Sequence, residues 1–479
     1  MKWELIPAPK TIQLTDEIWT HPIGIIAEDP LFEKAVILME KDLKHLFPEA
    51  EQAPGICLKC QHDLEAEAFV IDITADAIEL FASTVTGMQH AFSALLQLAT
   101  DIEGEVCFPC GHIENAPDKE YRGLMIDPAR AYLPMNFILP MVDAARIFSL
   151  SVLHLHLSDD QAYTLPSKAF PDLPTKGHCY SEEEIRILVE YADMAGVELM
   201  PEIETPGHCT QLQAAYPEVF GSNGIVRLSE TALEGTKKLV KETAELFPNS
   251  KRIHIGGDEA KLENWYADEE SVQYMRAHGL STMHEAYAYF VGQIAEYVLS
   301  LGKIPVVWEG FPSRYNDLVD HRTEVFAWES YYQLAPELLK SGFKVINASW
   351  RPMYLDLPDT YWSPTEINRW WDVYTWLHWM PASPAYHNDL KVTATDQVIG
   401  GQLCAWDGRE SRYGIDKEEE LSDKADKILE RLGVLSEKTW NADHADQVNE
   451  HGQKLGTMAS FATRYDLIKM WEIVSRFSD

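Results

Sequence analysis

The sequence predicts an α/β protein in which a (β/α)8 barrel, the TIM barrel fold, follows a small α+β domain. Three observations lead to this prediction. The first 118 residues contain short alternating runs and one apolar helical pattern. Eight apolar runs then alternate with helical patterns, and nearly every run ends in carboxylates or tryptophans. A chain of 479 residues is long enough for the two domains that this division requires.

The first domain is predicted from residues 1–118. AFVIDITADAIELFAS at 68–83 alternates apolar and polar residues as half-buried strands do, and GMQHAFSALLQLATDI at 87–102 has the periodicity of a helix. A helix that covers one face of a sheet gives an α+β arrangement. The segment HIENAPDKEY at 112–121, with its proline and charges, is the expected boundary, so residues 119–479 are expected to form the barrel.

The barrel is predicted from eight runs rich in valine, isoleucine and leucine. Helical patterns lie between several of them; SEEEIRILVEYADMAG at 181–196 opens with a serine N-cap and acidic residues in its first turn. Strands that alternate with helices form a parallel sheet, and eight of them close a barrel. The runs are RGLMID at 122–127, SVLHLHL at 151–157, VELMPEIE at 197–204, RIHIGGDE at 252–259, KIPVVWE at 303–309, TEVFAWE at 323–329, FKVINASW at 343–350 and GGQLCAWD at 400–407.

Acidic residues and tryptophans gather at the carboxyl ends of the predicted strands, the face of a barrel that carries its active site. Tryptophan rings stack on the apolar faces of sugars, and carboxylates accept hydrogen bonds from hydroxyls. One tryptophan alone would be a packing residue, but four at this face favour a sugar-binding pocket. The residues are Asp127, Asp159, Asp160, Glu202, Glu204, Asp258, Glu259, Trp308, Glu309, Trp328, Glu329, Trp350, Trp406 and Asp407.

The composition argues against several classes of partner. The sequence has 40 Lys and Arg against 76 Asp and Glu, a formal charge of −36, which repels nucleic acid and anionic membrane surfaces. No run of about eighteen apolar residues is present, so no membrane span is expected. The amino-terminal sequence MKWELIPAPKTIQL lacks the apolar core of a secretion signal, and a cytoplasmic location is therefore expected.

The seven cysteines are an odd number, spread thinly, and do not suggest a disulfide framework. Four of them form two CxxC pairs, Cys57 with Cys60 and Cys107 with Cys110, and two such pairs can hold zinc tetrahedrally. Both pairs lie beside strand-like runs, where reduced cysteines are ordinarily buried, and we favour this second interpretation.

The motif HIGGDE at 254–259 resembles the catalytic sequence of the family 20 glycoside hydrolases, the β-N-acetylhexosaminidases. Further similarity follows in order along the chain and covers nearly the whole barrel. The matching segments are RGLMIDPAR at 122–130, LHLHLSDDQ at 153–161, PEIETPGH at 201–208, VVWEG at 306–310, FAWES at 326–330, MYLD at 353–356 and GGQLCAW at 400–406. The first domain is similar to the small α+β domain that often precedes this barrel.

The resemblance implies an exo-acting, retaining enzyme that removes terminal non-reducing GlcNAc or GalNAc from oligosaccharides or glycoconjugates and needs no cofactor. In its substrate-assisted mechanism, the 2-acetamido oxygen attacks the anomeric carbon and an oxazolinium ion forms. Glu259 would be the general acid, and Asp258 the carboxylate that stabilises the acetamido group. Asp159 and His208 would form a relay with Glu259.

The resemblance also implies the substrate contacts and shows two departures from the family pattern. Gly408 stands where the family often has a glutamate that contacts the 4- and 6-hydroxyls, and Asp407 or Glu410 could substitute for it. Glu204 stands where an aspartate is usual. The implied contacts are Arg122 with the 3- and 4-hydroxyls, Tyr354 with the acetamido oxygen, Asp356 with a hydroxyl, and Trp308, Trp328 and Trp406 as pocket walls.

The adjacent acids Asp258 and Glu259 fit the implied mechanism chemically. Most retaining glycosidases place an acid and a nucleophile about 5 Å apart, whereas neighbouring residues on a strand point to opposite faces. After the end of a strand, Gly256 and Gly257 permit a turn in which both acids face the pocket. Because a general acid must be protonated, we expect burial and the charge of Asp258 to raise the pKa of Glu259.

Two other interpretations use some of the same residues. His154 and His156 form an HxH pattern on one strand face. With His208, His254 and Asp258 at other strand ends, they could bind zinc in a metal-dependent barrel hydrolase. That interpretation leaves the tryptophans and the GGDE turn without a role. The other is a catalytically inactive sugar-binding relative, and the intact carboxylate pair of the GGDE turn argues against it.

Overall fold

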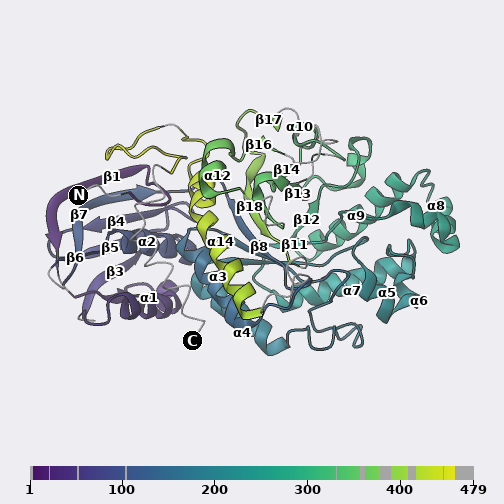
Figure 1. The fold of residues 1–479 in the computed structure, drawn as a ribbon, viewed down its shortest axis with the longest axis horizontal. Helices are drawn as coiled ribbons and strands as arrows, with labels where there is room; N and C mark the ends of the chain where they lie inside the picture. The colour runs from purple at the N-terminus through teal and green to yellow at the C-terminus, as the bar shows by residue number, and fades with distance from the viewer. Residues whose placement is uncertain are drawn as a thin grey trace.

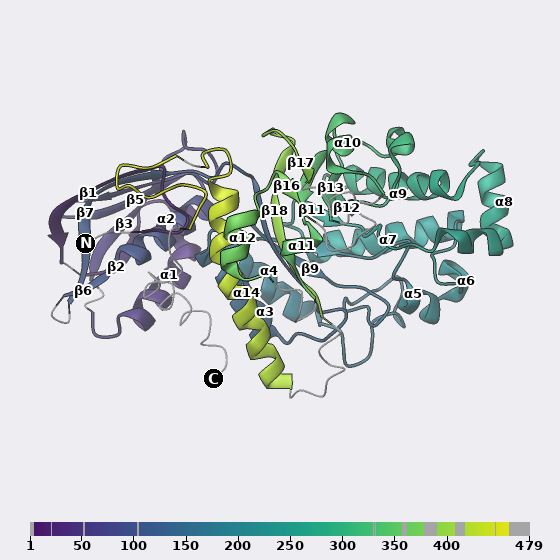
Figure 2. The same ribbon diagram turned by 45° about the horizontal axis from the view of Figure 1, so that its top comes forward.

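Both parts of the predicted architecture are present in the computed structural model, which describes residues 4–20, 22–50, 53–102, 105–328, 330, 332–356, 362–377, 390–407, 417–445 and 447–458. Figures 1 and 2 show the N-terminal domain beside the barrel, with the long helix α14 (Lys417–Trp440) between them. No helix within these ranges is both long and apolar enough to cross a membrane.

The N-terminal domain is built on a seven-stranded sheet in the order β1-β7-β4-β5-β3-β2, with β6 paired to β7. The predicted strands at 68–83 form the antiparallel pair β4 and β5, and the predicted helix is α2. α2 packs on β4 and β5 and also against the barrel helices α3 (Met135–Ile147) and α4 (Glu182–Ala195), so it is buried over most of its length. The elements are β1 (Thr11–Trp19), β2 (Gly24–Ala27), η1 (Pro30–Phe32), α1 (Glu33–Leu46), β3 (Pro54–Cys60), β4 (Phe69–Ile73), β5 (Ile78–Ala82), α2 (Val85–Leu98), β6 (Thr100–Ile102) and β7 (Glu105–Asn115).

The two CxxC pairs lie on different strands of this sheet. Cys57 and Cys60 are on β3, Cys107 and Cys110 are on β7, and β5 and β4 separate these strands. At about 4.8 Å per strand the pairs are about 14 Å apart, and residues three apart on one strand face opposite sides. The two pairs therefore cannot share one zinc ion, in agreement with the interpretation as unbridged cysteines.

The eight predicted barrel strands are confirmed, and they close a parallel barrel because β18 pairs with both β14 and β8. The strands are β8 (Tyr121–Ile126), β9 (Val152–His156), β10 (Glu198–Glu202), β11 (Arg252–His254), β12 (Ile304–Trp308), β13 (Glu324–Ala327), β14 (Lys344–Asn347) and β18 (Val398–Ala405). The remaining elements are α5 (Thr210–Ala215), α6 (Pro217–Phe220), α7 (Glu230–Leu246), η2 (Leu262–Ala267), α8 (Glu269–Ala277), α9 (Met283–Ser300), η3 (Ser313–Leu318), α10 (Ala335–Lys340), α11 (Trp350–Met353), β15 (Tyr354–Leu355), α12 (Pro364–Trp370), β16 (Thr375–Trp376) and β17 (Leu390–Lys391). The predicted serine cap is present at α4, where Ser181 and Glu184 form a reciprocal capping box.

The chain returns to the N-terminal domain after α14. Figures 1 and 2 show the following segment, coloured yellow, alongside that domain. Glu437 accepts a 2.6 Å hydrogen bond from the backbone N–H of Ala8, and the indole N–H of Trp440 donates to Asn115 at 3.0 Å. The end of the barrel sequence is thus fixed to the first domain, and the boundary at residue 118 stays a prediction.

Arg122, predicted to hold sugar hydroxyls, lies at the amino-terminal end of β8, where the barrel meets the N-terminal domain. Its fully buried guanidinium donates to the carbonyl oxygens of Ser149 and Lys119 at 2.8 and 2.7 Å, and to the carboxylate of Glu67. The predicted sugar contact is wrong, because the two ends of a barrel strand lie on opposite faces of the barrel. Burial alone would raise the pKa of Glu67, but the charge of Arg122 and a hydrogen bond from His90 lower it to about 2.

The barrel interior contains a carboxylate surrounded by histidines. Burial alone would raise the pKa of Glu202, but the histidines around it hold the pKa well below its usual range. These histidines are at most 1% exposed, so the HxH pair of the metal-dependent interpretation supports the barrel core and does not face a substrate. The carboxylate oxygens of Glu202 lie 2.5 Å from Nδ1 of His156, 2.8 Å from Nδ1 of His254, 3.1 Å from Nε2 of His154 and 2.6 Å from the indole nitrogen of Trp308.

Glu204, the acid that stands where the family usually has aspartate, is also fully buried. Burial first, and then the charges of Asp258 and Glu202, raise its pKa well above the ordinary value. A Cβ atom on Gly256 would lie 2.2 Å from Oε2 of Glu204, so glycine at that position makes room for the longer acid. The two buried acids thus have pKa shifts in opposite directions, downward for Glu202 and upward for Glu204.

We expect Arg122→Met to destabilise the protein by about 3–5 kcal/mol without weakening substrate binding, because Glu67 loses its buried partner. Since the pKa of Glu67 is depressed, this stabilisation is complete above pH 4.5 and is lost as the pH falls toward 2. Urea unfolding at neutral and acidic pH measures the loss, and KM is compared where both proteins are folded. A raised KM with unchanged stability would restore Arg122 as a sugar ligand.

Glu202→Gln and Glu204→Gln make the same chemical change two residues apart. Glu202→Gln should cost about 3–5 kcal/mol at neutral pH, because it removes the anion at the centre of a buried ion-pair cluster. Glu204→Gln should be neutral or slightly stabilising. Because folding raises the pKa of this carboxyl, wild type loses stability as the pH rises above 4.5, and the amide does not titrate. Urea midpoints give the order, and a larger loss in Glu204→Gln would contradict it.

Candidate active site

The turn after β11 accounts for the two glycines of HIGGDE. β11 ends at His254, and Gly256, Gly257 and Glu259 then have φ angles of 76°, 110° and 46°. Glycine adopts such angles without strain, whereas a positive φ at Glu259 is uncommon and is typical of functional sites. The turn brings Asp258 and Glu259 to one cavity at the carboxyl ends of the strands.

His208 connects the loops that follow β9, β10 and β11. Its Nδ1 lies 3.2 Å from Oδ1 of Asp159, and its Nε2 lies 3.3 Å from Oε2 of Glu259 and 3.7 Å from Oδ2 of Asp258. Like Glu259, it has a positive φ, 43°. The structure therefore brings together the four residues predicted to be catalytic, in the order that a relay from Asp159 through His208 to Glu259 requires.

The pKa of Glu259 is shifted in the direction opposite to the one expected, and the cause is His208. Burial lowers the pKa of His208, but the charge of Asp258 and the hydrogen bond to Asp159 outweigh it and raise the pKa well above the ordinary value. His208 in turn lowers the pKa of Glu259, whose carboxylate lies at ion-pair distance from its imidazole and whose side chain is 55% exposed. The expected elevation of the Glu259 pKa by Asp258 is therefore wrong, because the imidazole of His208 lies 3.3 Å from the Glu259 carboxylate.

Asp258 is the buried member of the carboxylate pair, at 8% exposure. Burial raises its pKa, the charge of His208 opposes this, and the charge of Glu259 adds to it. Its Oδ1 is buried and has no hydrogen-bond partner within the described ranges. A buried acceptor without a donor is costly, so this oxygen is suited to receive an N–H or O–H from a bound molecule.

Arg130 occupies the pocket position that was predicted for Arg122. It forms ion pairs with Asp127 at 2.9 Å and with Asp159 at 2.7 Å, and its guanidinium lies 4.5 Å from the ring centre of Trp406. Burial lowers the pKa of Arg130, and its two carboxylate partners raise it well above the usual range. The sequence could have distinguished the two arginines, because Arg130 follows the end of the first barrel strand whereas Arg122 lies at its start.

The cavity has a volume of about 170 Å³ and aromatic walls. Trp328 and Tyr354 stack with planes 3° apart, and Trp406 lies 5.7 Å from Tyr354 between ring centres. Trp308, predicted as a wall, is 1% exposed and instead supports Trp406 from 5.9 Å. The residues that line the cavity are Arg130, Gln161, Asp258, Glu259, Trp328, Trp350, Tyr354, Asp356, Trp406 and Asp407.

Asp407 lines the cavity beside the position of the missing family glutamate, whereas Gly408 and Glu410 lie outside the described residues. The carboxylate of Asp407 forms an ion pair with the buried Lys424 of α14, and its backbone N–H donates to Asp127 at 3.2 Å. A carboxylate is thus held at this wall by a neighbouring cation.

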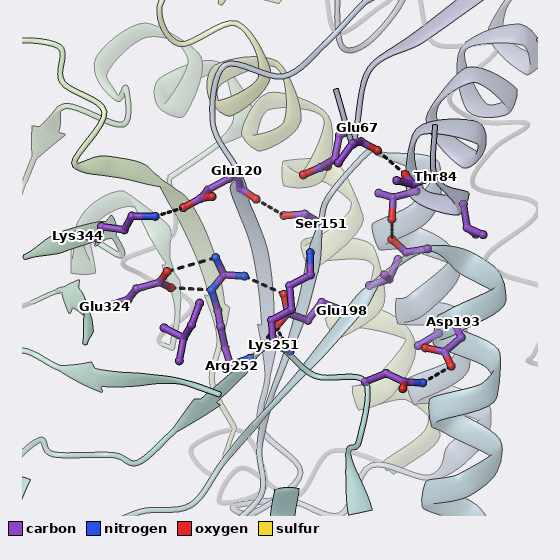
Figure 3. Close-up of a pocket in the computed structure, with 18 residues that line it drawn as sticks. Glu67, Thr84, Glu120, Ser151, Asp193, Glu198, Lys251, Arg252, Glu324 and Lys344 are labelled. Atoms are coloured by element: carbon purple, nitrogen blue, oxygen red, sulfur yellow. Dashed lines mark hydrogen bonds and ion pairs between the residues drawn. The ribbon is translucent and has the colours of Figure 1, made fainter. Parts of the chain in front are cut away.

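A larger cavity lies at the opposite end of the barrel, against the N-terminal domain (Figure 3). Its volume is about 540 Å³, and Figure 3 shows Arg252 on its wall, paired with Glu198 and Glu324. None of the predicted site residues lines it. Residues at this face of a barrel ordinarily serve stability, so the chemistry favours the smaller cavity as the active site.

Both domains of the chain are similar to known proteins. Residues 120–443 match the family described as glycosyl hydrolase family 20, catalytic domain, and residues 2–116 match glycosyl hydrolase family 20, domain 2. A β-hexosaminidase subunit beta from Entamoeba histolytica is 28% identical over 439 residues, covering 84% of this chain and 74% of that protein. The human β-hexosaminidase subunit beta is 28% identical over 410 residues, covering 81% and 69%.

Solved structures are similar over almost the whole chain. The family 20 exo-β-N-acetylglucosaminidase of Vibrio harveyi, solved with N-acetylglucosamine, has a TM-score of 0.78 and 20% identity, covering 99% of this chain and 77% of that one. The chitobiase of Flavobacterium johnsoniae has a TM-score of 0.75 and 22% identity, covering 99% and 72%. Together with the family match over both domains, this means that the chain belongs to glycosyl hydrolase family 20 and is a glycoside hydrolase.

Proposed function

We propose that the protein is an exo-acting β-N-acetylhexosaminidase that retains anomeric configuration by substrate-assisted catalysis. The observation that supports this best is the buried, unpartnered Oδ1 of Asp258 beside the solvent-exposed Glu259. Asp258 is suited to accept a hydrogen bond inside the pocket, and Glu259 is suited to exchange protons at the entrance of the pocket. The named relatives are hexosaminidases, in agreement with a substrate that has an acetamido N–H.

In the first step the substrate supplies its own nucleophile. The 2-acetamido oxygen forms a bond to the anomeric carbon as the glycosidic C–O bond breaks, and Glu259 gives its proton to the leaving oxygen. Asp258 accepts the acetamido N–H and stabilises the positive charge of the oxazolinium ion. In the second step water attacks the anomeric carbon, Glu259 takes a proton from it, and the acetamido group is restored.

In this mechanism, substrate binding shifts the pKa values of Glu259 and Asp258 in opposite directions. A sugar that covers Glu259 removes water from its carboxyl and raises its pKa, whereas the acetamido N–H gives Asp258 a donor and lowers its pKa. Asp159 holds His208 by a hydrogen bond, and His208 in turn acts on the pKa of Glu259. The substrate therefore establishes the pair of one protonated and one ionised acid that the chemistry needs.

The cavity favours the removal of a single terminal sugar. Its volume of about 170 Å³ is below the range of roughly 300–1,000 Å³ that is common for ligand sites. Trp328, Tyr354 and Trp406 provide aromatic faces for one sugar ring, while Arg130, Asp356 and Asp407 present charges to its hydroxyls. The partners we propose are oligosaccharides or glycoconjugates that end in N-acetylhexosamine. A cytoplasmic location stays a prediction.

Glu259→Gln and Asp258→Asn should separate the two acids by their response to the leaving group. Without the acid Glu259, chitobiose should lose far more rate than aryl glycosides of acidic phenols, which need little protonation. Without the Asp258 charge, good and poor leaving groups should both lose about a hundredfold or more in kcat. Rates over a series of aryl leaving groups measure both effects.

A thiazoline that mimics the cyclised intermediate provides the control, because such analogues report complementarity to the transition state. It should inhibit wild type strongly and Asp258→Asn weakly. A sugar trapped covalently on a carboxylate, or full activity on substrates that lack the acetamido group, would contradict the mechanism. Absence of turnover on every aryl N-acetylhexosaminide would favour the inactive sugar-binding interpretation.

The glycine at position 408 predicts weak discrimination between GlcNAc and GalNAc, within about tenfold or about 1.4 kcal/mol. The ratio of kcat/KM for the two aryl glycosides measures it. If one epimer is preferred by about a thousandfold, roughly 4 kcal/mol, the prediction is wrong and another residue has taken over the contact. Asp407, held by Lys424, is then the candidate, and Asp407→Ala should abolish most of the preference.

A further inference from the structure

Tyr287 reaches from the outer layer of the barrel to the catalytic turn. It lies on α9, is 1% exposed, and its hydroxyl donates a hydrogen bond to the carbonyl oxygen of Gly257. The sequence of α9 reads as an ordinary barrel-covering helix, and its other buried residues pack in the core. The hydroxyl of Tyr287 therefore makes a contact that hydrophobic packing does not require.

Two glycines make room for this hydroxyl. A Cβ atom on Gly310, after the end of β12, would lie 2.5 Å from the Tyr287 oxygen and 2.7 Å from the carbonyl oxygen of Gly257. A Cβ atom on Gly257 itself would lie 3.0 Å from the same hydroxyl. A side chain at Gly257 or Gly310 would crowd the tyrosine hydroxyl or the turn.

The carbonyl of Gly257 belongs to the peptide unit that joins it to Asp258. Because a peptide unit is planar, fixing this carbonyl also fixes the position of the next backbone nitrogen and α-carbon. The point from which the Asp258 side chain starts is therefore fixed by this peptide unit. Burial first, and then the charge of Asp258, raise the pKa of Tyr287 well above its ordinary value, so the phenol keeps the proton that it donates.

We propose that Tyr287 is a positioning residue, which holds the Gly257–Asp258 peptide so that the Asp258 carboxylate points at the acetamido group of the substrate. The inference rests on the proposed function, because it assigns Tyr287 a task only if Asp258 stabilises the acetamido group. A small displacement of a catalytic group is enough to matter, since misplacement by about 1 Å can cost about a hundredfold in rate.

The first test is Tyr287→Phe, with Tyr297→Phe on the same helix as the matched control. Tyr287→Phe should lower kcat on aryl N-acetylglucosaminides by about tenfold or more, and should weaken thiazoline inhibition by a similar factor. Its dependence on the leaving group should stay that of wild type, because Glu259 is intact. Tyr297→Phe removes the same hydroxyl from a partly buried position elsewhere on α9 and should leave kcat and thiazoline inhibition unchanged.

A double variant separates positioning from general structural damage. If Tyr287 acts through Asp258, adding Tyr287→Phe to Asp258→Asn should change kcat by less than about twofold, because the group that it positions has already lost its charge. A further loss equal to that of the single variant would overturn the proposal. Gly310→Ala, which crowds the same hydroxyl and carbonyl, should reproduce the kinetic loss and decides the question if Tyr287→Phe does not fold.

The outcomes also separate this inference from the proposed function. A full rate in Asp258→Asn would overturn the role of that acid, and the positioning role with it. A large loss in Asp258→Asn with wild-type kcat and thiazoline inhibition in Tyr287→Phe would overturn only the positioning role.

Discussion

The carboxylate of Asp159 joins the barrel interior to the pocket. Its Oδ2 lies 2.9 Å from Nε2 of His156 and 2.7 Å from the guanidinium of Arg130, and its Oδ1 lies 3.2 Å from Nδ1 of His208. Burial alone would raise the pKa of Asp159, but these partners hold it well below its usual range. One stable anion thus contacts a histidine of the core cluster, the arginine of the pocket wall and His208 of the predicted relay.

The barrel strands were predictable because each rests on local sequence, whereas the four residues predicted to be catalytic came from the family resemblance. Apolar runs fix the barrel strands, and acids after those runs must lie at the carboxyl ends. The segment RGLMIDPAR shows where the resemblance alone was not enough, since it contains both Arg122 and Arg130. Arg122 was chosen from the resemblance, although only Arg130 lies beyond the end of β8. The position of an arginine along its strand decides between core and pocket.

Other features could not be read from the chain because they depend on residues far apart in sequence. Trp308 and Trp328 both follow apolar runs, yet the first is packed beneath Trp406 and only the second lines the cavity. The low pKa of Glu259 comes from His208, which lies in the loop after a different strand. Adjacent charges such as Asp258 are visible in a sequence, whereas a cation brought in by another loop is not.

The N-terminal domain spans the seam at which the barrel closes. β8 and β18, the first and last strands, pair with each other there. Arg122 of β8 is bound to Glu67 of this domain, and α14, which follows β18, is bound to it through Glu437 and Trp440. No βα connection crosses from β18 to β8, so this pair is joined only by non-covalent contacts. The small domain holds elements on both sides of this line, so its contacts with Arg122 and with α14 add to the β8–β18 pairing that closes the barrel.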